Sequence, residues 1–466
     1  MWAVRVPSTD LSTTAPAKDQ PVSRWTAPHV IEAAYAVVLL AALTQGPVLS
    51  LWLRAAQQGQ PAPDTAVVAT YLAMQMPAVA LLVRRGLPIS VDRRLLAALG
   101  AFVGWTLLST VWSTVRIQTM TTSITLATTT VAGVYLARFS CRRLATLTFV
   151  AMQPGLLLSE FALRRHWVGA VSPPDPSWNG AYFNRNSLGP PAIVGVFAGT
   201  LLIAHAVRTR HRGWAATAAV ATLFVLFDLR MQHGAGSATS WIALAVAVGT
   251  WVLWIFVRLW RHRKVSPSLT ALGRLHLMML VTGCGLIAVS ASRVSRLFGR
   301  PPGFDSRDLY WRADWRGVRI HPLRGWGWLA AWSTPSFRSH LAGPISTDFW
   351  SHNAYFDVAL GGGLVAAVMF AAVVVLGFGA AARVAGSSEP LAMWPLCVAS
   401  AVAVAATQES FFIGSHFYWL LLVAVFTHVA WSPLTSGPPC SADDRASRAG
   451  QLEPGDRDEG GDRPLR

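Results

Sequence analysis

The chain has 466 residues, of which 53% are hydrophobic and only 13% charged, and its mean hydropathy is +0.41. A soluble domain carries about twice that charged fraction, and the apolar background excludes a soluble nucleic-acid-binding protein despite the formal net charge of +17. Apolar runs of about 18–25 residues recur along the chain, and this length crosses a bilayer as a helix. The composition therefore predicts an all-α fold, a polytopic integral membrane helical bundle.

Polar segments flank the apolar runs. Residues 1–28 lack the apolar core and cleavage site of a signal peptide, so we expect a disordered cytoplasmic segment. Residues 432–466 mix Asp, Glu, Arg, Gly and Pro, and we expect a disordered cytoplasmic tail. Residues 29–431 are expected to form one transmembrane domain of about twelve helices. The predicted spans are 29–53, 65–83, 95–112, 120–139, 144–163, 187–207, 214–231, 238–260, 275–292, 353–382, 391–407 and 411–431.

Arginine placement predicts how these spans are oriented. With the N-terminus inside, the connections after even-numbered spans are cytoplasmic, and each of them is basic, as the positive-inside rule requires. These connections contain Arg84, Arg85, Arg93, Arg94, Arg138, Arg142, Arg143, Arg208, Arg210, Arg212, Arg258, Arg261, Arg263 and Lys264. We therefore expect a multi-pass protein of the cell membrane with both termini in the cytoplasm.

Two predicted outside connections break this rule. Arg164, Arg165 and Arg185 lie around the connection after span 144–163, and nine arginines lie in the large extracytoplasmic loop 293–352. Long loops cross the membrane regardless of their charge, so tolerated charge is one interpretation. A functional cluster of arginines on the outside face is the other, and we favour it.

Arginine and tryptophan alternate through the first half of the large loop. Arg307, Arg312 and Arg324 are interleaved with Trp311 and Trp326. Guanidinium groups match phosphate oxygens, and flat aromatic faces offer stacking surfaces. The pattern indicates a site for a phosphorylated, sugar-like ligand.

Two short polar motifs precede apolar spans on the predicted outside face. The run 184–187, Asn-Arg-Asn-Ser, places side-chain donors beside the free N–H groups of a helix start, which favours an anion. A plain helix cap with a snorkelling arginine is the alternative.

The run 351–353, Ser-His-Asn, repeats the arrangement. If Ser351 caps the helix, His352 lies in its first turn, where the dipole favours a neutral imidazole that can accept a proton. A histidine used only for hydrogen bonding is the alternative.

Two further features accompany these motifs. Glu409 lies in the short turn between the last two spans, where it could pair with a loop arginine or contact water. Gly361, Gly362 and Gly363 weaken helix propensity in span 353–382 but allow close helix approach. We assign the glycines no catalytic role.

Several motifs together carry a family resemblance. They are NRNSLG before one span, SATSW entering another, HPLRGWGW in the large loop and SHNAYFDVALGGGLVAAVMF at its end. Over roughly residues 153–431 the chain resembles the O-antigen ligase/polymerase family of polytopic membrane glycosyltransferases. It departs from the family at RMQHGAGSATSW, where Ser-Arg often precedes the small residues, so no role is carried over to Arg230.

The resemblance implies transfer of a glycan from a polyprenyl-diphosphate-linked donor to an acceptor hydroxyl on a lipid or glycan, at the extracytoplasmic face. It implies no cofactor and no metal, and the predicted outside loops contain no Asp-x-Asp motif, in keeping with arginine in place of a cation. Arginines would hold the diphosphate, and a histidine would be the base. The site residues so implied are His352 and Asn353 for catalysis, and Arg185, Asn186, Arg307, Arg312, Arg324, Trp311 and Trp326 for diphosphate and substrate binding.

Three alternatives stay open. A polymerase of the same family needs the same donor-binding site as a ligase, so the motifs do not distinguish the two activities. A lipid-linked glycan transporter or flippase would place ionisable groups at mid-membrane, whereas Glu32, Glu160 and Asp228 fall near predicted span ends. A membrane scaffold would explain the tryptophans but not arginine clusters before two separate helices. The sugar, the acceptor and the oligomeric state are not indicated.

Overall fold

The computed structural model describes residues 27–48, 64–86, 92–172, 176–182, 184–210, 212–261, 268–289, 307–339, 351–386, 389–412 and 416–431. The predicted polar tail 432–466, nearly all of the predicted leader 1–28, and loop residues 293–306 and 340–350 lie outside these residues.

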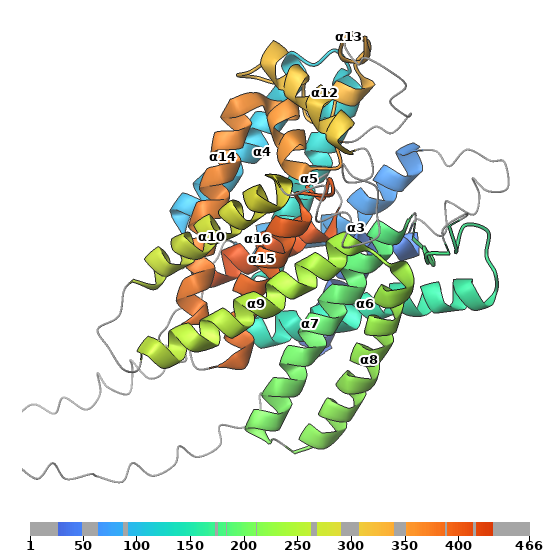
Figure 1. The fold of residues 1–466 in the computed structure, drawn as a ribbon, viewed down its shortest axis with the longest axis vertical. Helices are drawn as coiled ribbons and strands as arrows, with labels where there is room; N and C mark the ends of the chain where they lie inside the picture. Colours follow the sequence, from blue (N-terminus) through green and yellow to red (C-terminus); the bar gives the residue numbers. More distant parts are fainter. Residues whose placement is uncertain are drawn as a thin grey trace, which may run out of the picture.

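Helices make up almost all of the described regular structure (Figure 1). The one β contact among the described residues is an isolated pairing of Val171 with Trp178. The helices are α1 (Ala27–Leu43), α3 (Asp64–Arg85), α4 (Arg93–Leu108), α5 (Arg116–Leu136), α6 (Cys141–Arg164), α7 (Arg185–Thr209), α8 (Trp214–Ala235), α9 (Ala238–Arg261), α10 (Leu269–Val289), α12 (Arg307–Ile320), α13 (Pro335–Arg338), α14 (Ala354–Ala385), α15 (Trp394–Ala405) and α16 (Phe417–Trp431).

A helix overlaps every predicted span, although α1 ends at Leu43 and residues 49–53 of the first predicted span lie outside the described residues. Eight of the described helices are long and apolar enough to cross a membrane, which confirms the all-α, polytopic membrane fold. The helices α1, α15 and α16 are apolar but shorter, and α5 has 21 residues but is rich in threonine. The number of spans that cross the bilayer stays a prediction.

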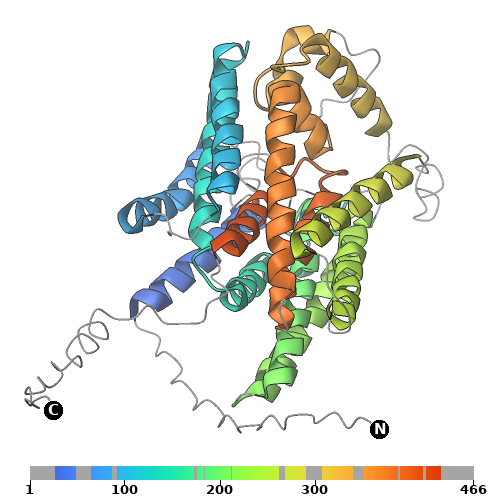
Figure 2. The ribbon, with the colours of Figure 1, turned by 90° about the vertical axis from the view of Figure 1, so that its left-hand side faces the viewer.

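The long helix α14 runs through the bundle from one end to the other (Figure 2). It packs against α4, α10, α15 and α16, and α12 lies against its beginning. A second group forms around α7, which packs against α6, α8 and α9. Fully buried Trp328, Trp394 and Trp419 fill the core where these elements meet. The core is therefore shared by the whole domain.

Contacts at the two ends of the bundle join segments that the predicted topology places on the same side of the membrane. At one end, Arg85 pairs with Glu32, and Nε of Arg258 donates to the carbonyl of Ala385 at 2.7 Å. At the other end, Nε1 of Trp112 donates to the carbonyl of Arg324 at 3.1 Å. The first end carries the connections predicted to be cytoplasmic, and the second end carries the large loop.

One buried carboxylate corrects an expectation about the bundle interior. Asp228 lies inside α8, fully buried, and accepts a hydrogen bond from Nε2 of Gln153 on α6 at 3.2 Å. The absence of a side chain at Gly195 makes room for it, because a Cβ there would lie 2.2 Å from Asp228 Oδ2. The expectation that Asp228 lies near a span end is wrong, because α8 continues to Ala235.

The glycine run in α14 breaks the helix. Gly363 has φ 69° and ψ −169°, which is not helical. The loop segment 322–327 docks against this break: the carbonyl of Pro322 accepts from the backbone N of Leu364 at 2.8 Å, and the backbone N of Trp326 donates to the carbonyl of Leu360 at 2.9 Å. The glycines therefore do more than permit close helix approach, since they open the backbone to the large loop.

We expect alanine at Gly363 to destabilise the protein by about 1–3 kcal/mol or more. The positive φ is strained for any L-residue, and a Cβ would lie 2.2 Å from the carbonyl oxygen of Leu323. Gly283→Ala is the matched control, because a Cβ there meets nothing within 4 Å. Thermal unfolding of the purified variants measures the difference, and equal stability of the two variants would contradict the role of the break.

Candidate active site

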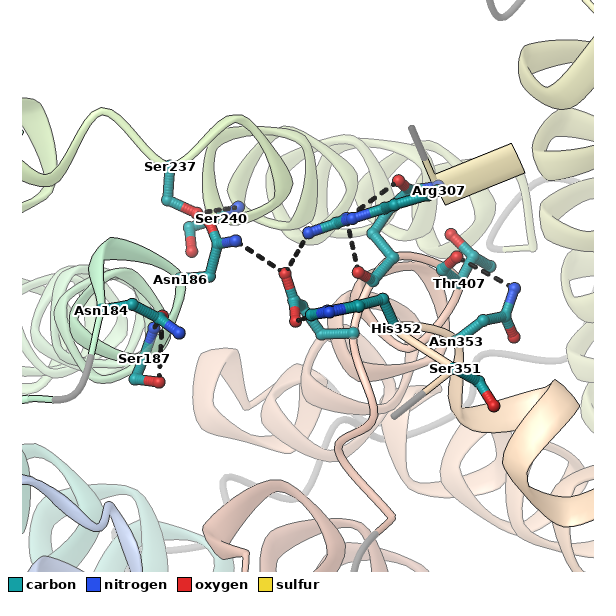
Figure 3. A network of polar contacts seen from close by, with 12 residues as sticks. Asn184, Asn186, Ser187, Ser237, Ser240, Arg307, Ser351, His352, Asn353 and Thr407 are labelled. Carbon is teal, nitrogen blue, oxygen red and sulfur yellow. Dashed lines mark hydrogen bonds and ion pairs between the residues drawn. The ribbon is translucent and has the colours of Figure 1, made fainter. Parts of the chain in front are cut away.

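The helix starts and loop residues singled out in the sequence come together at one end of the bundle. The helices α7 and α9 begin there, α12 and the beginning of α14 lie beside them, and the turn between α15 and α16 joins them (Figure 3). These elements are distant in sequence, so the site forms only when the bundle folds. The contacts converge on the carboxylate of Glu409.

Three of the residues predicted for the site contact Glu409. Its Oε1 accepts hydrogen bonds from Nη2 of Arg307 at 2.6 Å and from Nδ2 of Asn186 at 2.7 Å. Its Oε2 lies 3.4 Å from Nδ1 of His352. The side chains of Glu409 and Arg307 are only 12% and 11% exposed, so salt screens this ion pair weakly. Of the two possibilities left open for Glu409, the structure confirms pairing with a loop arginine.

The neighbours of Glu409 determine its charge. Burial by itself raises the pKa of this carboxyl, because water no longer solvates the charged form. The positive charge of Arg307 and the contact with His352 outweigh burial, and the pKa lies below its ordinary value. Glu409 is therefore an anion, and two of the groups that hold it, Arg307 and Asn186, were predicted from the sequence to bind the donor diphosphate.

Arg307 is the first residue of α12, and the α15–α16 turn fixes its guanidinium group. Nη1 donates to the backbone carbonyl of Gln408 at 2.5 Å and lies 3.3 Å from Gln408 Oε1. The flat fork of the guanidinium therefore binds the turn through two nitrogens. This contact ties the large loop to the last described turn of the chain.

The polar motif before α7 combines a helix cap with a bridge. Oδ1 of Asn184 accepts from the backbone N of Ser187 at 2.9 Å, as expected for an N-cap. Asn186, whose amide nitrogen contacts Glu409, accepts a hydrogen bond from Oγ of Ser237 on its amide oxygen at 3.1 Å. Arg185, half-buried, stands between these two asparagines as the first residue of α7. The start of α9 thus positions the amide that faces the carboxylate.

Asn353, and not Ser351, is the N-cap of α14. Its Oδ1 accepts from the backbone N of Tyr355 at 3.0 Å, and its Nδ2 donates to the carbonyl of Thr407 at 3.1 Å. The prediction that Ser351 caps the helix is therefore wrong. Asparagine at the cap satisfies free N–H groups of the first turn and also ties α14 to the end of α15.

His352 consequently precedes the helix and does not lie in its first turn. Its φ of 49° is left-handed, a conformation that a non-glycine residue adopts when its surroundings hold it. The ring packs edge-on against Tyr310, with the centroids 5.7 Å apart. When Nδ1–H donates to Glu409, Nε2 carries the free lone pair. A carboxylate, rather than the helix dipole, therefore orients this imidazole.

The other predicted loop residues lie around this cluster in different roles. Nε1 of Trp311 donates to the carbonyl of Ser351 at 3.2 Å, directly beside His352. Trp326 is buried in the aromatic core of the loop, and its Nε1 donates to the carbonyl of Gly317 at 3.0 Å. Arg312 and Arg324 are exposed on the same loop. The structure thus brings Arg307, Asn186 and His352 onto one carboxylate, but gives Trp326 a packing role.

An apolar groove of about 430 Å³ begins beside the cluster. It lies between α10, α14 and α15, and Tyr355 and Thr407 line it. The carbonyl of Thr407 is the one that accepts from Asn353, so the groove and the polar site share a border. An arrangement of this kind suits a ligand with an anionic head and a long apolar chain.

A further buried carboxylate was not predicted from the sequence. Asp314 lies on the face of α12 that packs on α14 and is fully buried, with the side chains of Ser351 and Trp332 beside its carboxyl. Burial raises its pKa well above the ordinary range, and the neighbouring carboxylate of Asp357 raises it further. The helical spacing of Tyr310, Ala313, Asp314 and Gly317 was the available signal. Asp314 therefore favours the neutral, protonated form.

This shift predicts a pH-dependent stability. The folded protein binds the Asp314 proton more tightly than the unfolded chain, so the contribution to stability is complete below the ordinary carboxyl pKa of about 4. It decreases as the pH rises toward the raised pKa of the folded state. We expect Asp314→Asn to flatten this slope and to be at least as stable as the wild type at neutral pH. Thermal unfolding between pH 4 and 8 tests it, and an unchanged slope would contradict the assignment.

No group of three or more His, Cys, Asp and Glu side chains within the described part of the chain could hold a metal ion. In a comparison with protein families, residues 233–371 match the family model described as O-antigen ligase. The matched segment runs from the end of α8 into α14 and includes Arg307 and His352, whereas Asn186 and Glu409 lie outside it. No curated protein matches the chain.

Proposed function

Because this multi-pass membrane protein belongs, through residues 233–371, to the O-antigen ligase family, we propose that it transfers a glycan from a polyprenyl-diphosphate-linked donor to an acceptor hydroxyl. The reaction takes place at the extracytoplasmic face and needs no metal. Arginines hold the diphosphate, and His352 is the base. A lipid or a growing glycan supplies the hydroxyl.

One observation carries this proposal. A guanidinium, a side-chain amide and an imidazole from three separate elements converge on a single anion, beside an apolar groove. A polyprenyl diphosphate has both parts that this arrangement suits, a diphosphate head and a long hydrocarbon chain. Arg307 can offer a planar fork to phosphate oxygens. The groove between α10, α14 and α15 would accommodate part of the chain.

In the proposed step, the acceptor oxygen attacks the anomeric carbon of the donor sugar. The bond from that carbon to the diphosphate oxygen breaks, and polyprenyl diphosphate leaves with the bonding electron pair. The acceptor proton passes to Nε2 of His352, because Nδ1 faces Glu409. The resulting imidazolium is stabilised by the Glu409 carboxylate, and the charge on the leaving diphosphate by Arg307. Arg185, Arg312 and Arg324 are further candidates for that charge.

The distribution of arginines supports the extracytoplasmic face. The site lies at the end of the bundle opposite to the contacts of Arg85 and Arg258, whose connections are predicted to be cytoplasmic. The arginines of the large loop and of the start of α7 would then cross the membrane during insertion and bind the substrate on the outside. Trp311, beside Ser351, would contact the donor sugar.

Purified protein tests the proposal. It is incubated with a polyprenyl-diphosphate glycan and with either a lipid acceptor or a short glycan acceptor, in the presence of a chelator, with His352→Ala as the control. One added unit on the lipid indicates a ligase, and a ladder on the glycan indicates a polymerase. Movement of the donor across a bilayer without bond formation would instead support the transporter alternative. Buried Asp228 favours that alternative, because transporters place ionisable groups inside membrane helices.

A further inference from the structure

We propose that Glu409 is an internal substitute for a donor phosphate group: its carboxylate occupies the anion site in the donor-free protein and leaves when the donor arrives. This inference rests on the proposed function and concerns the regulation of the same site. The groups that would bind the diphosphate are already engaged. Nη2 of Arg307 and Nδ2 of Asn186 both donate to Oε1 of Glu409, at 2.6 and 2.7 Å.

The chemistry of the contact resembles phosphate binding. A carboxylate and a phosphate both present planar or near-planar pairs of oxygens to a guanidinium fork, and both accept from amide N–H groups. Glu409 does so at short distances, in a pocket where its own side chain and that of Arg307 are largely buried. The site is therefore organised around an anion before any substrate enters.

Charge makes simultaneous occupancy unfavourable. A diphosphate bound by Arg307 would place its negative oxygens next to the Glu409 carboxylate, in a region that salt screens weakly. Arg307, Asn186 and His352 already contact that carboxylate in the structure. Two anions would therefore compete for one guanidinium group.

The two oxygens of Glu409 suggest where the carboxylate goes. Oε1 bonds to Arg307 and Asn186, but Oε2 faces Nδ1 of His352 at 3.4 Å, a long contact. When the donor takes Arg307 and Asn186 from Oε1, the imidazole of His352 is the remaining partner of Glu409. The distance between Oε2 and Nδ1 of His352 can then shorten. Arrival of the donor would thus strengthen the carboxylate–imidazole pair that favours proton transfer to Nε2. Glu409 is a positioning residue in this scheme.

Binding of inorganic diphosphate to the purified full-length protein tests the inference. We expect Glu409→Gln to bind diphosphate about tenfold more tightly than the wild type, because a neutral amide competes less well for Arg307, yet to turn over the lipid donor more slowly. Glu160→Gln is the matched control, since Glu160 pairs with Arg164 and Arg230 at the same end of the bundle. That variant should bind diphosphate as the wild type does.

Equal or weaker binding by Glu409→Gln, or no measurable binding by either protein, would overturn the inference. Glu409→Asp is a second variant in case glutamine prevents folding: it keeps the charge on a shorter side chain, and its affinity should fall between those of the wild type and Glu409→Gln. The proposed function is judged separately. If the wild type transfers glycan but the variants bind diphosphate no more tightly than it does, the proposed function stands. Only the inference that Glu409 occupies the phosphate site is then wrong.

Discussion

Replacing His352 with alanine should lower the rate of glycan transfer by a factor of about 10²–10⁴, the usual contribution of a general base. Binding of the lipid donor should persist, because we assign it to Arg307 and Asn186. His352→Gln should be about as slow as alanine, since glutamine forms hydrogen bonds but does not take up a proton. Transfer rates and donor affinities of the purified variants, measured side by side, check both expectations.

The glutamine variant separates two roles for this histidine. A near-normal rate for His352→Gln would mean that the side chain only positions the acceptor. A near-normal rate for alanine would remove His352 from the site altogether. His321→Gln is a control on the same loop, because that ring packs against Trp326, with the centroids 4.4 Å apart, and not against Glu409. It should leave the transfer rate close to that of the wild type.

Replacing Arg307 should affect both binding and turnover. Arg307→Lys keeps the charge but loses the bidentate fork, so we expect clearly weaker transfer. Arg307→Ala should nearly abolish transfer and also lower stability by about 3–5 kcal/mol, because it leaves the buried Glu409 carboxylate without its guanidinium partner. Transfer assays are therefore combined with thermal unfolding and with the amount of protein in the membrane.

A control on the same helix isolates the effect of Arg307. Arg319, near the end of α12, lies over the exposed ring of Trp315 at 5.4 Å and makes no contact with Glu409. Arg319→Ala should retain normal transfer. If alanine at Arg307 retains it as well, with the protein folded, the loop arginines serve only to solvate the surface.

Local patterns predicted the secondary structure well. Each predicted span overlaps a helix, because apolar runs of membrane-spanning length have few other structures available to them. The start of α7 was also predicted, since Asn184 caps it through a contact with Ser187 that depends on residues three positions apart. The cap of α14 was placed two residues too early, at Ser351 in place of Asn353, because Ser and Asn are both good caps and only the fold selects between them.

Long-range contacts were harder to predict. Glu409 meets Arg307 across 102 residues and Asn186 across 223, and no local pattern encodes such separations. Its pairing with a loop arginine could only be stated as one of two possibilities. Asp314 was missed because an acidic residue among arginines suggests a solvated surface, whereas α12 buries it against α14. Trp326 fitted the pattern of a stacking surface but packs inside the loop.

The break in α14 has a consequence for how the protein is made. In hydrocarbon, each backbone group without a partner costs several kcal/mol, and the amide of Leu364 and the carbonyl of Leu360 obtain their partners from Pro322 and Trp326 in the large loop. This loop precedes α14 in the chain and emerges first from the ribosome. If the loop lies on the extracytoplasmic face, as we propose, its translocation is a precondition for a stable α14. Variants that delay it should be recognised by membrane quality-control proteases as incompletely inserted chains.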